Sequence, residues 1–142
     1  MIVPDLNLLI YALDELSPQH ERAQRWWLGV LSGDEAVGLC DCVIFGFIRL
    51  STRRGVFAHP LNIDDALAVA EEWVNQPNVE VLESCARSRA IAFAQLRKLG
   101  TGGNLTTDCQ IAALALRENA TVHCNDTDML RFDGLRVHNP LA

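Results

Sequence analysis

Apolar and polar residues follow two distinct patterns along this chain. Short runs in which nearly every residue is apolar are separated by longer segments in which apolar residues recur every three or four positions. Continuous short runs are typical of strands buried on both faces of a sheet, and the wider spacing is typical of helices that bury one face. The runs predict strands at residues 2–3, 36–40, 79–82, 121–124 and 135–138.

The segments between these runs predict helices. The segment after Pro18 is an example, because Trp26, Trp27 and Val30 fall on one helical face. The predicted helices begin near residue 6, at Pro18, at Val43, at Asn62 or Asp64, at Ser84 and at Thr106. Strands that alternate with helices indicate an α/β fold, here a three-layer α/β/α arrangement around a short parallel sheet. The length suits a single domain, residues 1–142.

Aspartates stand where an apolar run ends or a helix begins. Asp5 follows the first predicted strand, and Asp126 follows the fourth, with Asp128 two residues further on. Asp108 belongs to Thr106-Thr107-Asp108, which has the composition of a capped helix start after a glycine-containing loop. Ligand sites in parallel sheets lie outside the carboxyl ends of the strands, so we expect these aspartates to converge there.

Converging carboxylates favour a divalent metal site. Their negative charges raise one another's pKa unless a cation neutralises them, and Mg²⁺ or Mn²⁺ prefers carboxylate oxygens. A metal held in this way activates water and stabilises a leaving oxygen, which suits hydrolysis of a phosphodiester. Taken singly, Asp108 is equally typical of a helix cap, and Asp126-x-Asp128 of the start of a helix. No glycine-rich phosphate loop is present, so nucleotide binding has little support.

The composition limits the kinds of partner that we expect for this protein. The hydrophobic fraction of 49% and the charged fraction of 21% are those of a globular protein. No apolar run is long enough to cross a bilayer and no secretion signal is visible, so we expect a cytoplasmic protein with no membrane contact. A net charge of −6 argues against nucleic-acid binding by a basic surface alone, although not against binding assisted by metal ions. It also suits a basic protein partner.

Five cysteines have neither an even number nor the spacing of a disulfide framework. Cys40-Asp41-Cys42 is the one close pair, and no second pair follows it to complete a structural zinc site. We therefore expect reduced thiols, most of them packed in the core.

Three segments together resemble a known family. They are residues 3–9 (VPDLNLL), residues 103–115 with Asp108, and residues 125–141, in which NDTDMLRF is followed by GL and NPL. The chain resembles a PIN domain along its whole length, in particular the VapC type of bacterial toxin–antitoxin ribonuclease. The fold implied is the α/β/α sandwich already expected.

The resemblance implies a function and a set of site residues. Asp5, Asp108 and Asp126 would be catalytic and metal-binding, and Asp128 would be a fourth metal ligand. The protein would be a Mg²⁺- or Mn²⁺-dependent endoribonuclease toxin whose metal-activated water attacks an RNA such as tRNA or ribosomal RNA. A homodimer inhibited by a cognate antitoxin is also implied. The resemblance does not specify the RNA target, the cleavage site, the number of metals or the identity of the antitoxin.

The chain departs from the family pattern at Gly46, where a glutamate is usual three residues before Arg49. Asp41 is a substitute for the missing acid or, more simply, a helix cap. Arg49 is a partner for a site carboxylate or an ordinary surface charge. Cys124 replaces a hydroxyl residue, and Met129 replaces a phenylalanine, which is a tolerable packing exchange. One alternative function is therefore a catalytically weak PIN domain that binds an antitoxin or RNA.

Two further features have competing interpretations. Arg49, Arg53 and Arg54 form the densest basic cluster, which either steers RNA or is a solvated helix end. The three tryptophans fit a core or a dimer surface better than a base-stacking platform. A second alternative function, an aspartyl-phosphate phosphatase, requires an acid two residues after Asp5, where Asn7 stands.

Overall fold

The computed structural model describes all 142 residues and contains one five-stranded sheet. All neighbouring strands are parallel, in the order β3-β2-β1-β4-β5. The strands are β1 (Ile2–Pro4), β2 (Val37–Cys40), β3 (Val79–Leu82), β4 (Thr121–His123) and β5 (Arg136–His138). The five predicted strands are confirmed, each within one residue at either end.

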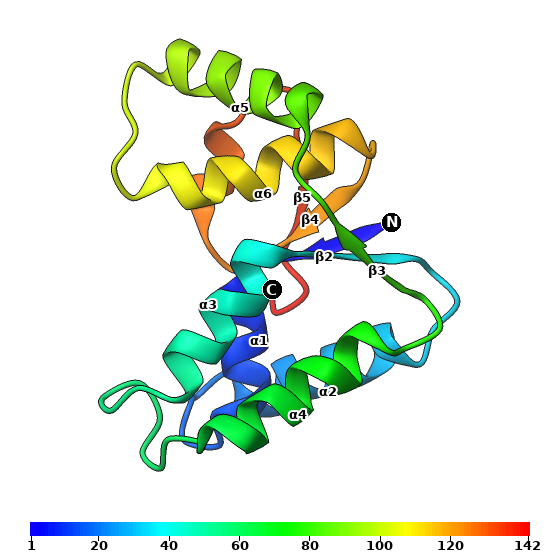
Figure 1. Ribbon diagram of the computed structural model, residues 1–142, viewed down its shortest axis with the longest axis vertical. Coiled ribbons are helices and arrows are strands. Elements are labelled where there is room, and N and C mark those ends of the chain that lie inside the picture. The colour runs from blue at the N-terminus through cyan, green and yellow to red at the C-terminus, as the bar shows by residue number, and fades with distance from the viewer.

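Six α-helices and one 3₁₀ helix connect the strands. They are α1 (Leu6–Leu13), α2 (His20–Leu31), α3 (Asp41–Ser51), α4 (Ile63–Val74), α5 (Ala86–Leu99), α6 (Leu105–Arg117) and the 3₁₀ helix η1 (Thr127–Arg131). Figure 1 shows α5 and α6 on one side of the sheet and α1 to α4 on the other. The predicted three-layer α/β/α architecture is therefore confirmed. No helix is both long enough and apolar enough to span a bilayer.

One hydrophobic core joins the layers. Val3 and Val122 on neighbouring strands are fully buried, and the same core contains Leu8 of α1 and Ala112 of α6. The small alanine side chains of α6 let that helix approach the sheet closely. Trp27 and Trp73 are also buried, with ring centroids 5.6 Å apart in an edge-to-face arrangement, so these two indoles belong to the core as expected. Trp26 is half-buried and donates a hydrogen bond from Nε1 to Nδ1 of His123.

The predicted start of four helices was wrong by one or two residues. One of them is α3, which begins at Asp41 and not at Val43. The turn at Pro18 precedes α2, which begins at His20, and α5 is capped at Cys85 rather than at Ser84. The more important case is α6, which begins at Leu105, so Asp108 is its fourth residue and not a cap. The glycine turn supplies the reason: the carbonyls of Gly102 and Gly103 accept the first helical N–H groups, at 3.0 and 3.1 Å. Because these donors are already satisfied, the Asp108 carboxylate is left free.

Candidate metal centre

Asp5 is fixed where β1 passes into α1. Its backbone N–H donates to the carbonyl of His123 on β4, at 2.9 Å, and so extends the β1–β4 pairing by one residue. Its extended backbone makes it the N-cap of α1, and its Oδ1 accepts the Leu6 N–H at 2.8 Å. The side chain is 5% exposed. The strand and the helix together hold this carboxylate at the carboxyl edge of the sheet.

Asp108, Asp126 and Asp128 come together from α6 and from the start of η1. Asp126 is the N-cap of η1, and its Oδ1 accepts the backbone N–H of Asp128 at 3.0 Å. Asp108 and Asp128 are half-buried and Asp126 is exposed. One carboxylate oxygen from each of the three lies within 4.8 Å of the others. The structure thus brings these three predicted site residues into one cluster, here called the acid cluster.

Asp5 lies beside the acid cluster without being one of its three members. Its pKa is raised to about 6, chiefly because burial disfavours the charged carboxylate, and the charges of Asp108 and Asp126 add to this effect. The hydrogen bond from Leu6 opposes the shift. The pKa of Asp108 is also raised, first by burial and then by the charges of Asp126 and Asp128. The four carboxylates therefore act on one another electrostatically.

No basic side chain neutralises these carboxylates. The two ion pairs in the protein are Lys98–Asp133 and Arg117–Glu118, and neither includes a member of the acid cluster. Oxygen donors that converge without a protein cation are the environment that a hard divalent ion prefers. The residues present therefore fit Mg²⁺ or Mn²⁺ by their chemistry and their charge.

Two hydrogen-bonded contacts order the loop that carries Asp126, and sequence reasoning missed both. Cys124 donates from Sγ to the carbonyl of Asp126 at 3.3 Å. Asn139 donates from Nδ2 to Oδ1 of Asn125 at 2.9 Å, and its own Oδ1 accepts the N–H of Leu141. The family resemblance includes residues 139–141, but no local pattern predicts that Asn139 contacts Asn125.

At position 46, where the family usually has a glutamate, a neighbouring side chain fills the space that a longer residue would need. Gly46 is buried on α3, and a Cβ added there would lie 2.7 Å from Cδ2 of Leu6, the residue after Asp5. Asp41 is the exposed first residue of α3; it lies outside the acid cluster and caps nothing. Arg49 is exposed and makes no ion pair, so its interpretation as a surface charge holds. Neither residue replaces the absent acid.

Cys42, in the first turn of α3, lies near Asp5, and no local pattern in the sequence predicts this proximity. A hydrogen bond with the Cys40 thiol lowers the pKa of Cys42, while burial and the negative charge of Asp5 oppose that shift. All five cysteines are free thiols. The start of α3 therefore lies within range of the Asp5 charge.

Sequence comparison places the chain among known proteins. The statistical description of the PIN domain matches residues 2–135. Ribonuclease VapC33 of Mycobacterium tuberculosis is 45% identical over 141 residues, which are 99% of each chain. Ribonuclease VapC37 of the same species is 34% identical over 142 residues and covers 100% of this chain and 99% of its own.

Solved structures share the fold at low sequence identity. VapC20 of Mycobacterium tuberculosis, described as a sarcin–ricin loop cleaving toxin, superposes with a TM-score of 0.71 at 19% identity, covering 96% of this chain and 99% of its own. A VapBC2 chain from Rickettsia felis, solved on a fragment of its promoter DNA, gives a TM-score of 0.70 at 19% identity, covering 98% of both chains. At this identity the likeness concerns the fold alone.

Proposed function

This chain belongs to the PIN-domain family, in its VapC-type branch, and on that premise we propose that it is a divalent-metal-dependent endoribonuclease, the toxin of a toxin–antitoxin pair. The observation that carries the proposal is the acid cluster, in which three carboxylates meet beside Asp5 with no cationic side chain to neutralise them. An arrangement needed only for folding would have paired those charges or separated them.

Each carboxylate has a role in this proposal. Asp108, Asp126 and Asp128 would hold Mg²⁺ or Mn²⁺, together with Asp5 from the neighbouring strand end. The ion, when bound, supplies a Lewis acid and lowers the pKa of a coordinated water. Oδ1 of Asp5 is fixed by the Leu6 N–H, so Oδ2 remains to orient the attacking water. Hydrolysis then adds that water at phosphorus and breaks one phosphate ester bond of the RNA.

The partners follow from the same family. We propose that residues 1–142 act as one PIN-like domain in the cytoplasm, as a homodimer, and that a cognate antitoxin inhibits it. The net charge of −6 suits a basic inhibitory segment. A structured RNA, such as tRNA or ribosomal RNA, is the proposed substrate, as the resemblance to VapC-type ribonucleases implies.

Cleavage of total cellular RNA by the purified protein tests the proposal. Mg²⁺ or Mn²⁺ should produce discrete fragments, and both EDTA and Asp5→Asn should abolish them. Asp133→Asn is a matched control, because it removes a carboxylate that Lys98 already neutralises. Circular dichroism should show that the Asp5→Asn variant is folded. Equal cleavage by folded Asp5→Asn would contradict the proposed site.

Gly46 motivates the alternative of a catalytically weak module that binds an antitoxin or RNA. Gly46→Glu restores the acid usual in the family, and Leu6→Ala removes the atom that the new side chain would meet. Cleavage by the double variant should be compared with Leu6→Ala carrying Gly46→Gln, which has the same shape without the charge. A gain in cleavage rate of about tenfold or more with glutamate but not with glutamine would show that the native site lacks a ligand. No gain would show that the existing carboxylates suffice.

A further inference from the structure

A stripe of α3 that is exposed at Phe45 and Arg49 begins near Asp5 and runs away from it. Cys42, Phe45 and Arg49 stand at i, i+3 and i+7, so they share a helical face. The stripe starts beside the site, since Cys42 lies within range of the Asp5 charge and Gly46 meets Leu6. From Cys42, Arg49 lies about 10 Å further along the helix axis.

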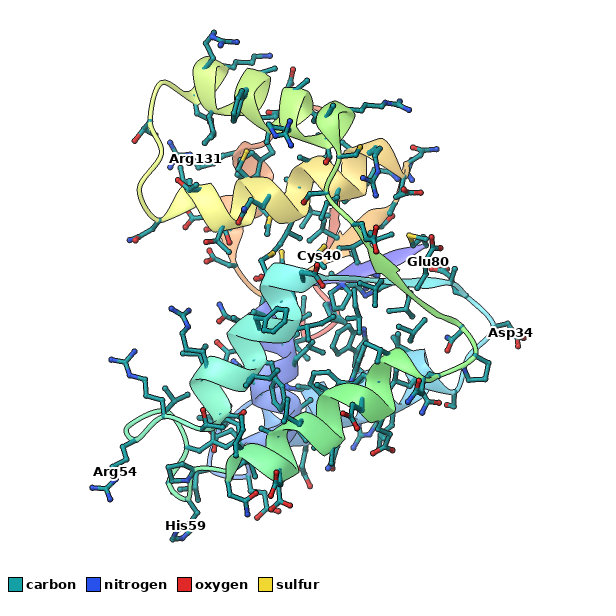
Figure 2. All side chains as sticks on the ribbon, in the orientation of Figure 1. Asp34, Cys40, Arg54, His59, Glu80 and Arg131 are labelled. Atoms are coloured by element: carbon teal, nitrogen blue, oxygen red, sulfur yellow. The ribbon has the colours of Figure 1, made fainter.

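The stripe combines an exposed aromatic ring with unpaired positive charge. Phe45 is 66% exposed, among the most exposed large apolar side chains of the chain. Arg49 on the helix, with Arg53 and Arg54 just beyond its end, is exposed and takes part in no ion pair. In Figure 2, Cys40 marks the start of α3 near the sheet, and Arg54 projects into solvent at the far end of this lobe.

This combination suits a single strand of RNA. Proteins bind single strands by stacking bases on aromatic rings and by placing basic side chains along the phosphates. An RNA that reaches the acid cluster and Asp5 meets four carboxylates on a protein of net charge −6, so positive charge is needed next to the site. A second copy of this chain fits less well, because a contact between two copies through this face would bury the arginines of both, and Asp41 is the only acid on α3 that could pair with them.

We propose that the stripe from Phe45 to Arg53 is the RNA-binding track of the enzyme. Phe45 stacks on a base next to the scissile phosphate, and Arg49 and Arg53 bind phosphates of the strand that leads away from the site. This assignment rests on the proposed ribonuclease function. It adds positioning residues on α3 to the aspartates that carry the chemistry.

Binding of a fluorescently labelled single-stranded oligoribonucleotide tests the track without cleavage, when every variant also carries Asp108→Asn. Phe45→Ala should weaken binding by about 5- to 150-fold, the range for loss of one base stack, with an unchanged salt dependence. Arg49→Gln with Arg53→Gln should reduce the slope of log affinity against log salt by about 1.4, or about 0.7 for each lost phosphate contact. Phe45→Trp should retain binding.

A matched control exists on the opposite lobe. Phe93 and Arg97 of α5 repeat the exposed aromatic–arginine pair at i and i+4, and Phe93 lines a cavity of ≈ 250 Å³ to which none of the four aspartates contributes. Phe93→Ala with Arg97→Gln should bind RNA as the parent does. Equal weakening by this control, or unchanged binding by Phe45→Ala, overturns the track.

Two further readouts separate the possible failures. Conversion of a dimer to a monomer by Phe45→Ala, measured by light scattering, would assign the stripe to contact between copies and overturn the RNA assignment. Cleavage assays are run in parallel with Asp108 intact. If the parent cleaves RNA and the stripe variants cleave and bind it equally well, the track alone is rejected. If the folded parent neither cleaves nor binds RNA, the proposed function is rejected as well.

Discussion

Two groups of carboxylates in this protein differ in how their charge is compensated. Asp133 is exposed, forms an ion pair with Lys98, and its backbone N–H donates to Gln95. Asp108, Asp126 and Asp128 lie together with no cation beside them. Asp133 links the segment after η1 to α5. In the acid cluster the carboxylates repel one another, and a divalent ion would relieve that repulsion. Charge compensation, more than exposure, distinguishes the candidate functional acids from the structural one.

The largest expected difference between the two groups is in RNA cleavage. Asp108→Asn or Asp126→Asn should lower the cleavage rate at least about 100-fold, because loss of a direct ligand should exceed the 10- to 100-fold cost of losing its supporting groups. Asp133→Asn should stay within about twofold. Initial rates on a fixed RNA substrate at saturating Mg²⁺ measure both. Comparable losses in all three variants would show that Asp133 and the acid cluster do not differ in their contribution to cleavage.

The pH dependence of stability should expose the cost of burying Asp5. Its pKa rises from 3.8 to about 6 on folding, so the folded state binds the proton more tightly than the unfolded state does. That contribution to stability is complete below about pH 4 and is lost as the pH rises through 6. Relative to Asp5→Asn, the metal-free wild type should lose up to about 3 kcal/mol of unfolding free energy between pH 4 and 7. Urea titrations at several pH values in EDTA measure this difference, and parallel curves for the two proteins would contradict it.

Divalent metal should stabilise the folded protein through the acid cluster. At 100 times its Kd, Mg²⁺ or Mn²⁺ should add about 2.7 kcal/mol, or a Tm rise of about 10 °C for a domain of this size. Asp108→Asn with Asp126→Asn should abolish the rise, while Asp133→Asn should keep it. Thermal unfolding with Mg²⁺, with Mn²⁺ and with EDTA gives the comparison. The same rise in the double variant would place the metal elsewhere.

Removal of the ion pair between Lys98 and Asp133 should have the smallest effect on stability. Lys98→Ala removes an exposed ion pair, which should cost less than about 1 kcal/mol and less still at high salt. The response of Tm to Mg²⁺ should be unchanged. A larger loss, or an altered metal response, would show that Asp133 and the acid cluster are coupled through η1.

The sequence by itself determined the architecture and the set of acids. The alternation of short apolar runs with amphipathic segments specified five strands, because strands buried on both faces must be apolar throughout. It also placed Asp5 after the first predicted strand and Asp126 after the fourth, and the carboxyl ends of parallel strands share an edge of the sheet. These are local or topological consequences of the pattern, so they could be predicted without coordinates.

Only the tertiary structure decided which groups meet and which are kept apart. The glycine turn, by satisfying the first N–H groups of α6, freed Asp108 from the capping role that its local sequence predicted. Leu6 fills the space that a side chain at position 46 would need, and Asn139 orders the loop of Asp126. The contacts of Leu6 with Gly46 and of Asn139 with Asn125 join segments distant in sequence, and their distances depend on how helices and loops pack around the sheet. For that reason the sequence named the aspartates, while packing set their separations and their pKa values.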